Sequence, residues 1–530
     1  MENNVKAFEK GEMCSLTIDD MSPEGAGIGR ARGLVVFVAG AVVGDEIQAE
    51  ITKVKKNYAF GRLIKILKAS EMRVEPACGQ ADQCGGCPYA SISYEGQLQV
   101  KEGQVRAAIE RLGGVESPVI RHIIGMEAPW YYRNKAQMPV STGGIITRKG
   151  GIVESLGEPS VGFFKAKSHE VVDCRKCQLQ APTVQAVAEA LRHFMKEDNI
   201  TGYDPKWDKG LMKHLIVKTA FGTGEVMVTL VINGKGIPNG EKLIGMMDDA
   251  INQLPPMENG VYFSLESVNV NINKGKSQDI MGKETKLIAG KPVITEEVGN
   301  LRFEISPTAF YQVNPVQMRV LYDKVVEYAD LSGDEKILDL YCGVGTIGLY
   351  MLDAMRRKTG QEHPGGSVLG VEYVKEAVVD ANRNAVINGM VNARYMAGRA
   401  EELIPQILSG YEDRDGFQVP AFEPDIIVLD PPRAGCHEDL LRTAAGAGAS
   451  KIIYVSCNPA TLARDIKILS QLGYDFVEAT PVDMFPHTGH VETVCLLSNT
   501  QRPKKESYIT LDVEMEDYYR IKNEGKKSTT

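Results

Sequence analysis

The feature that most constrains the fold is a pattern repeated between about residue 298 and residue 500, in which a strongly apolar strand is followed by a turn and a helix. The four strands are expected at Lys336–Leu340, Val368–Glu372, Ile426–Asp430 and Lys451–Ser456. Continuous apolar strands that alternate with helices indicate a parallel sheet buried on both faces. Ligands in such sheets bind at the carboxyl ends of the strands. The sequence therefore predicts an α/β domain whose functional site lies at that edge.

The rest of the 530-residue chain is too long to share this core and should form further domains. Alternating or β-branched stretches at Leu34–Val38 and Glu46–Val54 predict a small β-barrel. Strand patterns at Leu215–Thr219 and Val226–Ile232, mixed with a few helices, predict a central α+β domain. We expect domains at 1–70, 71–297 and 298–500, and a charged, disordered tail at 501–530.

Hydropathy and the first residues bear on the class of protein. The longest run without a polar side chain, Leu34–Gly44, is far shorter than the roughly 18 residues that a membrane-spanning helix needs, so we expect no membrane association. The opening residues Met-Glu-Asn-Asn-Val-Lys contain no apolar signal core, so we expect a cytoplasmic protein, and we expect a monomer. In such a chain, ten cysteines favour free thiols or metal ligands over disulfides.

A local basic stretch bears on the partner. The net charge of −9 argues weakly against a polyanion, but nucleic-acid binding depends on local patches. Residues 53–68 carry six basic side chains and no acidic ones, with Tyr58 and Phe60 among them. Such cations can neutralise phosphates while the rings stack on unpaired bases. The stretch is consistent with an RNA surface and also with an ordinary solvated strand face.

A glycine-containing turn follows the first strand of the C-terminal pattern. In the sequence Ile337–Thr346, Gly343 and Gly345 allow a ligand to approach the backbone closely. The next strand ends in Glu372, whose carboxylate can accept both hydroxyls of a ribose. We expect S-adenosylmethionine here. Nicotinamide enzymes use similar groups, so a nicotinamide cofactor stays open at this point.

The third strand ends in a more specific sequence, Asp430-Pro-Pro-Arg433. The two prolines hold the chain extended and donate no backbone N–H. Enzymes that methylate exocyclic amino groups have a similar turn, with an aromatic residue after the prolines to stack on the base. Arg433 occupies that position here, which argues for a different target atom.

The fourth strand supplies a candidate nucleophile. Cys457 follows this strand and is followed by Asn-Pro, so we expect it at the same edge as Asp430 and Glu372. A buried structural cysteine is the alternative. Beside the last apolar strand, Glu492 is the candidate base, with His487 and His490 as rivals and a surface glutamate as the alternative.

Together these residues resemble the RNA 5-methyluridine methyltransferase family, which includes TrmA-type tRNA enzymes and RumA-type ribosomal RNA enzymes. The resemblance covers roughly residues 8–498 and rests on the markers Phe310–Asn314 (FYQVN), Leu338–Gly345 (LDLYCGVG), Leu429–Arg433 (LDPPR), Val455–Pro459 (VSCNP) and His490–Val494 (HVETV). It implies a class I, Rossmann-like methyltransferase domain and an N-terminal TRAM barrel that binds RNA.

The resemblance also assigns roles to residues. It implies that Cys457 is the nucleophile and Glu492 the proton acceptor, and that four residues contact S-adenosylmethionine: Gln312, Tyr341, Glu372 and Asp430. Carbon 5 of uracil is a poor nucleophile until a thiolate adds to carbon 6 and converts the ring to an enolate. After methyl transfer, a base must remove the carbon 5 proton so that the thiolate can leave.

A second set of cysteines lies in the central section. Cys78, Cys84 and Cys87 share a short loop, and Cys174 and Cys177 lie downstream. Four thiolates suit either a [4Fe–4S] cluster or structural zinc, and the long first spacing is unusual for zinc. RumA-type enzymes carry a cluster on this arrangement, so we expect a [4Fe–4S] cluster. Cys177 matches the family position for the fourth ligand better, and Cys174 stays open.

The cluster and the barrel point to 23S ribosomal RNA as the substrate, because TrmA-type enzymes generally lack both, although some relatives with the same parts act on tRNA. Lys213 and His214 match a family segment and are candidates for RNA contact or for a polar strand edge. Two other classes remain to be weighed. A non-catalytic RNA-binding protein is disfavoured by the intact Cys457, Glu492 and Asp430, and an amino-group methyltransferase is disfavoured by Arg433 and Cys457.

Overall fold

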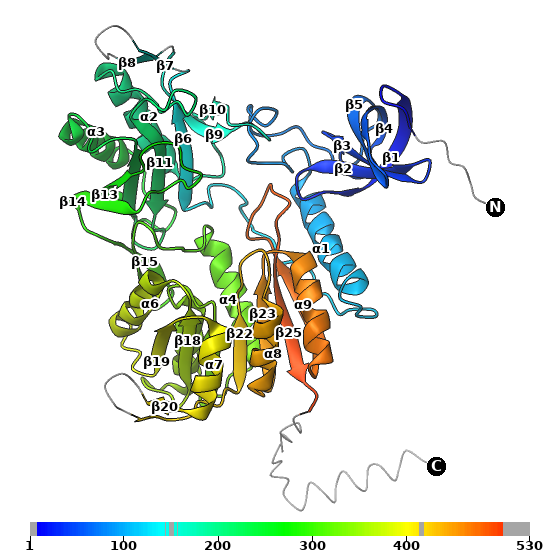
Figure 1. Cartoon of the computed structure of the whole chain (residues 1–530), viewed down its shortest axis with the longest axis vertical. Helices are drawn as coiled ribbons and strands as arrows, with labels where there is room; N and C mark the ends of the chain where they lie inside the picture. Colours follow the sequence, from blue (N-terminus) through cyan, green and yellow to red (C-terminus); the bar gives the residue numbers. More distant parts are fainter. Residues whose placement is uncertain (1–7, 144, 148–152, 156, 413–417, 502–530) are drawn as a thin grey trace, which may run out of the picture. The chain divides into compact units, whose positions relative to one another are not determined.

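The computed structural model describes residues 8–143, 145–147, 153–155, 157–412 and 418–501. Its elements are labelled in Figure 1. Residues up to Asn499 belong to one compact unit. The predicted disordered tail lies, apart from Gln501, outside the described residues.

The N-terminal residues form the predicted barrel. Its strands are β1 (Met13–Met21), β2 (Ala26–Ala31), β3 (Leu34–Ala39), β4 (Glu46–Val54) and β5 (Tyr58–Lys68), closed in the order β1-β2-β3-β5-β4. Alternate residues such as Val36, Val38 and Ile47 are buried inside, as the period-2 pattern of a strand requires. The barrel prediction is confirmed.

The central section is built on a seven-stranded sheet of order β10-β9-β6-β11-β12-β13-β14. Its strands are β6 (Lys135–Ser141), β9 (Ser160–Phe164), β10 (Val171–Asp173), β11 (Met212–Thr219), β12 (Glu225–Ile232), β13 (Ser264–Ile272) and β14 (Glu284–Gly290). Helices α2 (Pro182–Glu197) and α3 (Gly240–Asn252) pack against it, and their apolar residues share one core with the sheet. Two hairpins accompany it: β7 (Ile145–Thr147) with β8 (Val153–Ser155), and β15 (Ile294–Val298) with β16 (Leu301–Ile305).

The C-terminal section contains the predicted sheet, which is parallel apart from β25. Its order is β19-β18-β17-β22-β23-β25-β24. The strands are β17 (Lys336–Leu340), β18 (Ser367–Glu372), β19 (Ala393–Ala397), β22 (Ile426–Leu429), β23 (Lys451–Ser456), β24 (Tyr474–Val482) and β25 (Glu492–Asn499). A short hairpin of β20 (Tyr411–Glu412) and β21 (Gln418–Val419) lies between α7 and β22. The α/β prediction is confirmed.

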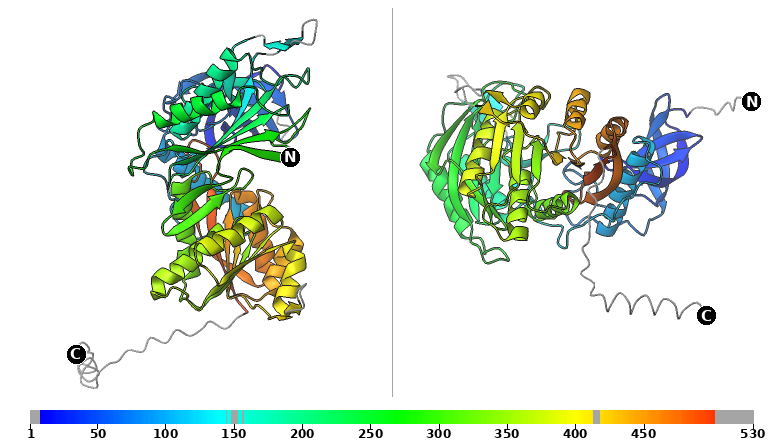
Figure 2. Two further views of the ribbon diagram at one scale, coloured as in Figure 1. Left: turned by 90° about the vertical axis from the view of Figure 1, so that its left-hand side faces the viewer. Right: turned by 90° about the horizontal axis from the view of Figure 1, so that it is seen from below.

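Helices cover both faces of this C-terminal sheet (Figure 2). One face packs against α4 (Pro315–Ala329), α5 (Thr346–Thr359) and α6 (Lys375–Ile387). The other packs against α7 (Ala400–Ser409), α8 (Glu438–Gly446) and α9 (Pro459–Gln471). This double covering explains why the strands are continuously apolar.

Helix α1 (Tyr94–Arg111) also packs on this second face, although it precedes the C-terminal sheet by more than two hundred residues of sequence. Its Val105 and Ile109 share a core with Leu462 and Ile466 of α9 (Figure 1). The strand-like segment after α1 continues along β24, where Ile120 and Ile124 form isolated bridges. The C-terminal sheet is therefore completed by an early part of the chain.

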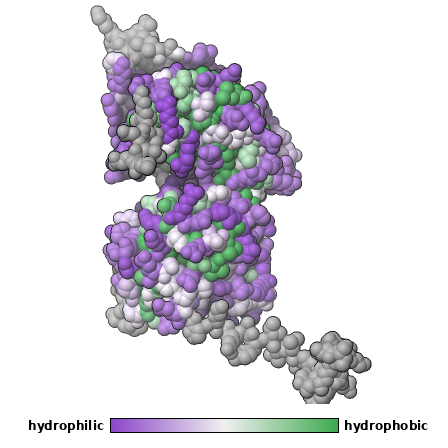
Figure 3. Space-filling view, turned by 90° about the vertical axis from the view of Figure 1, so that its right-hand side faces the viewer, coloured by the Kyte–Doolittle hydropathy of each residue, from purple (hydrophilic) through white to green (hydrophobic). Residues whose placement is uncertain are grey.

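No helix among the described residues is long and apolar enough to cross a membrane. On the face shown in Figure 3, apolar side chains are interspersed among hydrophilic ones.

Candidate active site

The carboxyl ends of four adjacent parallel strands bring the predicted residues to one edge of the C-terminal sheet. The strands lie in the order β18, β17, β22, β23. Glu372 ends β18, Tyr341 follows β17, Asp430 follows β22 and Cys457 follows β23. Residues that the chain separates by up to 116 positions in sequence thus share an edge because parallel strands end on the same side.

The turn after β17 has the backbone that a ligand loop needs. Tyr341 has φ +63°, an uncommon value for a residue other than glycine, and Gly345 has φ +82°. A Cβ on Gly345 would lie 2.7 Å from the ring of Tyr395, so the backbone there passes very close to a side chain of β19. The Gly343-x-Gly345-x-x-Gly348 spacing is complete and is shared with dinucleotide-binding folds, so the turn alone does not identify the ligand.

Glu372 is held in place beside this turn. Its carboxylate accepts hydrogen bonds from the backbone N–H of Gly343, at 3.2 Å, and of Val374, at 2.8 Å. Asp339, buried within β17, accepts from the N–H of Gly348 at 3.1 Å, and burial raises its pKa to about 7. The two carboxylates fix the start of α5 and leave Glu372 at the strand end, where it can accept ribose hydroxyls.

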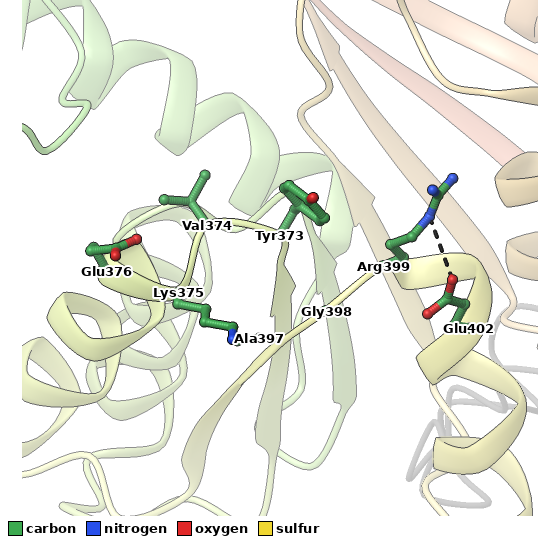
Figure 4. A pocket seen from close by; sticks show the side chains of 8 residues that line it. All are labelled: Tyr373, Val374, Lys375, Glu376, Ala397, Gly398, Arg399 and Glu402. Carbon is green, nitrogen blue, oxygen red and sulfur yellow. Dashed lines mark ion pairs between the residues drawn. The ribbon is translucent and has the colours of Figure 1, made fainter. Parts of the chain in front are cut away.

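A pocket of about 510 Å³ opens beside Glu372. Figure 4 shows the residues that line it, from the ends of β18 and β19 and the starts of α6 and α7: Tyr373, Val374, Lys375, Glu376, Ala397, Gly398, Arg399 and Glu402. The exposed ring of Tyr373 and the side chain of Val374 offer apolar surface to a flat heterocycle. On the α7 side of the pocket, the side chains of Arg399 and Glu402 form an ion pair at 3.7 Å. The position suits the base of an adenosine whose ribose is bound by Glu372.

Strand pairing brings the candidate nucleophile and base together. β23 and β25 are antiparallel with Ser456 opposite Thr493, so the next step of this register places Cys457 opposite Glu492. Burial, followed by the charge of Asp430, raises the pKa of Glu492 to about 8, and Arg433 opposes this. Burial, followed by Glu492, raises the pKa of Cys457 to about 11, and Arg433 again lowers it. Cys457, Glu492, Asp430 and Arg433 therefore act on one another electrostatically.

The candidate nucleophile, Cys457, is positioned by the start of α9. Asn458 caps this helix by accepting from the N–H of Ala460 at 3.1 Å, and Pro459 occupies the first helical position. The amide of Asn458 also donates to the carbonyl of Arg433 at 3.1 Å. One side chain thus ties the Asp430–Arg433 loop to the residue that follows Cys457.

The two rival bases lie in the segment before Glu492. Burial, followed by the charge of Arg433, lowers the pKa of His490 to about 4. Burial also lowers the pKa of His487 to about 4, and its Nδ1 lies 3.2 Å from the amide nitrogen of Gln97. Both histidines are thus expected to be neutral near pH 7.

Gln312 precedes α4 and is nearly buried. Its backbone carbonyl accepts a hydrogen bond from the side-chain amide of Asn134 at 3.1 Å.

With this geometry in hand, comparisons with known proteins identify the family. Residues 266–500 match the tRNA (uracil-5-)-methyltransferase family and residues 7–64 match the TRAM domain. The chain is 41% identical to an uncharacterized RNA methyltransferase of Caldanaerobacter subterraneus subsp. tengcongensis, over 93% of this chain and 99% of that protein. The chain belongs to the RNA uracil-5-methyltransferase family. It is also 38% identical to an uncharacterized RNA methyltransferase of Clostridium tetani, over 94% of this chain and 98% of the relative.

A solved relative supports the same assignment. The tRNA (uracil-54, C5)-methyltransferase of Pyrococcus abyssi, crystallised with S-adenosyl-L-homocysteine, superposes with a TM-score of 0.67 at 26% identity, over 91% of this chain and all of that one. The present uracil-5-methyltransferase is therefore an S-adenosylmethionine-dependent RNA methyltransferase. The glycine turn, Glu372 and the adjacent pocket fit an adenosine group, and the nicotinamide alternative is set aside.

The cysteine-rich loop of this methyltransferase packs on the β9–β10 hairpin. The N–H of Gly85 donates to the carbonyl of Phe164 at 3.2 Å, and the amide of Gln80 donates to the carbonyl of Asp173 at 2.6 Å. These hydrogen bonds bring the loop close to Cys177, which follows β10 by four residues. Burial, followed by the neighbouring thiols Cys177, Cys84 and Cys78, raises the pKa of Cys87 to about 12.

The fifth thiol of this region lies beside Cys177. Cys174 is buried, and a hydrogen bond between the two thiols is the main cause of the lowered pKa of Cys177. Within the part of the chain that the structure describes, no three His, Cys, Asp or Glu side chains stand close enough to hold a single metal ion. The ligand assignment to Cys78, Cys84, Cys87 and Cys177 stays a prediction.

The predicted RNA surface of the barrel has a mixed character. Phe37, Tyr58 and Phe60 form a cluster of rings with centroids 5.6–5.9 Å apart, and Tyr58 and Phe60 are exposed. Arg62 and Lys68 form ion pairs with acidic residues of β4, whereas Lys53, Lys55 and Lys56 are exposed around the β4–β5 turn. The turn is thus the more available cationic part of the 53–68 stretch.

The central candidates for RNA contact are engaged within the protein. Lys213 donates to the carbonyls of Asn273 and Gly275 at 2.9 and 2.7 Å, and its ammonium lies 4.4 Å from the ring of Tyr203. Burial lowers the pKa of His214 to about 4. These contacts favour the polar strand edge over an RNA contact.

Several site residues were missed by the sequence reasoning. Asp339 and Tyr373 lie next to predicted residues, and the strand-end pattern could have found them. Gln97 and Lys101, which contact the segment before Glu492, carry no comparable signal because they lie in a helix of an earlier section.

Proposed function

We propose that this protein methylates carbon 5 of a uridine in RNA, with Cys457 as the nucleophile and Glu492 as the base. The observation that carries the proposal is the antiparallel register of β23 and β25, which puts the thiol and the carboxyl side by side at the strand edge. Asp430 and Arg433 lie within electrostatic range of both groups. The enzyme is proposed to act in the cytoplasm as a monomer.

The proposed chemistry has two halves. In the first, the Cys457 thiolate adds to carbon 6 of the uracil, the ring electrons move to the carbon 4 carbonyl, and carbon 5 attacks the donated methyl group. S-adenosylmethionine, when bound, supplies that methyl on a sulfonium sulfur. In the second half, Glu492 removes the carbon 5 proton, the ring double bond re-forms and the bond to Cys457 breaks. One proton is released for each methyl transferred.

Four residues are proposed to hold the methyl donor: Gln312, Tyr341, Glu372 and Asp430. The carboxylate of Glu372, anchored to the N–H groups of Gly343 and Val374, suits the ribose hydroxyls. Burial raises the pKa of Asp430 to about 7, and a bound sulfonium cation would lower it again and favour the carboxylate. The pocket beside Tyr373 suits the adenine.

For the substrate we propose 23S ribosomal RNA, with tRNA as the alternative. The combination of a barrel and a cysteine-rich loop supports ribosomal RNA through the family resemblance. The Pyrococcus abyssi tRNA enzyme, which this chain matches over 91% of its length, supports the alternative. Mapping 5-methyluridine in both RNAs from cells that lack this protein distinguishes the two.

We further propose that Cys78, Cys84, Cys87 and Cys177 hold a [4Fe–4S] cluster with a structural role. The mutual influence of these thiols on their pKa values supports a common site. The long spacing between Cys78 and Cys84 is unusual for structural zinc, which favours the cluster.

The cluster proposal is tested on anaerobically purified protein. We expect a brown protein that contains iron and sulfide. Cys177→Ser should lose the colour. Cys174→Ser should keep it, because Cys174 is proposed to be a hydrogen-bonding neighbour of the ligand Cys177 and not a ligand itself. A colourless protein that contains zinc would contradict the proposal.

The methylation proposal is tested with RNA that carries 5-fluorouridine at the target. Fluorine cannot leave as a proton, so the methylated ring should stay bonded to Cys457 and survive denaturing electrophoresis. Cys457→Ala should give no adduct. A wild-type protein that binds the RNA without forming an adduct would instead be a non-catalytic binding protein.

A further inference from the structure

Residues 483–490, here called the pre-base segment, connect β24 to β25 and end two positions before Glu492. The last residue of β24, Val482, pairs with Glu492 across the two strands. The position of the carboxyl group therefore depends on how this segment is held. Most of its polar contacts with the rest of the protein come from parts of the chain outside the C-terminal sheet.

The first contact is a buried ion pair with α1. The ammonium of Lys101 donates to the carboxylate of Asp483 at 2.5 Å and to the carbonyl of Phe485 at 3.0 Å. Both charged side chains have no exposed surface. Charged groups are rarely buried unless they are paired, and breaking such a pair leaves a buried charge without compensation. The pair therefore fixes the start of the segment to α1.

The second contact is made by Gln97, one turn earlier on the same helix. Its carbonyl oxygen accepts from the N–H of His487 at 2.8 Å, and its amide nitrogen lies 3.2 Å from Nδ1 of that histidine. The same nitrogen donates to the carbonyl of Ile92 at 2.9 Å. His487 has φ +65°, an uncommon conformation for a residue that is not glycine, which persists only where the surroundings hold it.

Other residues outside the sheet complete the enclosure. The indole of Trp130 stacks on His487 with centroids 3.9 Å apart, and the hydroxyl of Tyr132 donates to the carbonyl of Pro486 at 3.0 Å. The amide of Asn314 donates to the carbonyl of Met484 at 3.0 Å. Lys101 and Gln97 are distinguished from these because both belong to one helix, α1, and lie one turn apart on its buried face.

We infer that α1, through Lys101 and Gln97, is the element that positions Glu492 for the second half of the reaction. The inference rests on the proposed function. Cys457 is positioned by the sheet and by the Asn458 cap, neither of which includes these two side chains. Loosening the pre-base segment should therefore slow removal of the carbon 5 proton while leaving the thiolate addition largely unchanged. Lys101 and Gln97 are positioning residues, since neither contacts the reacting atoms.

The experiment separates the two halves with two forms of the target RNA. Adduct formation with 5-fluorouridine RNA requires only the first half, whereas turnover of ordinary uridine RNA requires both. For Gln97→Met and Lys101→Met we expect the rate of adduct formation to stay within roughly threefold of wild type. We expect uridine turnover to fall roughly 10- to 100-fold, because a small displacement of a general base has effects of this size. A covalent complex with ordinary uridine RNA should then accumulate.

The control is Arg192→Met, which removes a buried arginine from its ion pair with the partly exposed Asp173 at 2.8 Å in the central section. It should lower stability without accumulating the uridine adduct. Gln97→Met leaves no buried charge behind, so it keeps the test valid if Lys101→Met does not fold. Equal loss of both rates in the Gln97 variant, or unchanged turnover, would overturn the inference. A wild-type protein that forms no 5-fluorouridine adduct would instead overturn the proposed function.

Discussion

At the scale of single residues, the proposed nucleophile and base of this methyltransferase hold each other in their protonated, unreactive forms. Burial and the charges of Asp430 and Glu492 favour the protonated forms of both Glu492 and Cys457, and Arg433 opposes them. A protonated carboxyl cannot accept the carbon 5 proton, and a thiol is a far weaker nucleophile than a thiolate. Arg433, at the position where amino-group methyltransferases carry an aromatic ring, thus favours the deprotonated, reactive forms of both groups.

These pKa shifts predict the pH dependence of the reaction. Since the pKa of Glu492 is raised to about 8, its reactive carboxylate becomes more abundant as the pH rises from 6 to 9. We expect kcat for release of tritium from 5-tritiated uridine RNA to rise through this range. The rise should be steeper than that of adduct formation on 5-fluorouridine RNA, which does not need Glu492. Identical pH profiles for the two measurements would speak against Glu492 as the base.

The raised pKa of Glu492, which favours the reaction at high pH, lowers the folding stability there. A carboxyl whose folded-state pKa lies above its unfolded value of 4.5 contributes stability that is present at low pH and is lost as the pH rises towards 8. Glu492→Gln should therefore flatten the stability of the apo-protein between pH 5 and pH 8, as measured by urea unfolding. The residue proposed as the base is thus expected to destabilise the folded protein near pH 8.

At the scale of elements, the strands of the C-terminal sheet were the most predictable part of the fold. The expected and observed bounds agree fully for Lys336–Leu340 and Lys451–Ser456, because apolar runs between turn residues have few alternative structures. In the barrel they agree fully for Glu46–Val54. The meeting of Cys457 with Asp430 and Glu372 also follows from strand order and strand ends. The pairing of β23 with β25, which brings in Glu492, could be suspected only from the family resemblance.

The role of α1 could not be predicted. A lysine and a glutamine in an 18-residue helix are normally read as solvent-facing, and nothing local marks Lys101 and Gln97 as buried. Their partners, Asp483 and His487, lie 382 and 390 positions further along the chain. Contacts of that range depend on the assembled tertiary structure, which hydrophobic periodicity does not encode.

The β4–β5 turn carries a prediction of its own. Replacing Lys53, Lys55 and Lys56 with alanine should weaken RNA binding and make the plot of log affinity against log salt shallower by about 2, at about 0.7 per phosphate contact on single strands. S-adenosylmethionine binding should be unchanged. Replacing the exposed lysines 274, 276 and 283 of the central section removes the same charge and serves as the control. An equal change of slope in both triple variants would mean that the turn has no special role.

At the scale of the whole molecule, the barrel, the cysteine loop and the pre-base segment meet at close range. A Cβ on Gly489 would lie 2.3 Å from the carbonyl oxygen of Pro23, and one on Gly25 would lie 2.5 Å from that of Pro88. The hydroxyl of Tyr89 also donates to the carbonyl of Ser22 at 3.2 Å. Backbones can approach this closely only where glycine is present.

This junction predicts the effect of adding one methyl group. Gly489→Ala should lower the free energy of unfolding by about 1–3 kcal/mol, because the backbone of Pro23 must move. Gly245→Ala in α3, where nothing lies within 4 Å of the added carbon, should be neutral or slightly stabilising. Urea unfolding of both variants measures the difference. An unchanged midpoint for Gly489→Ala would show that the barrel can move away without cost.

The ion pair between Lys101 and Asp483 also has a consequence for how the protein is made. A ribosome completes α1 several hundred codons before it reaches the partner of Lys101, so during that interval the helix has a cation and an amide on a face that later becomes dry. That face can close only once the chain has been made as far as His487. Products truncated before this residue should therefore keep α1 hydrated and accessible to proteases, and modification of RNA should begin only with chains that extend beyond it.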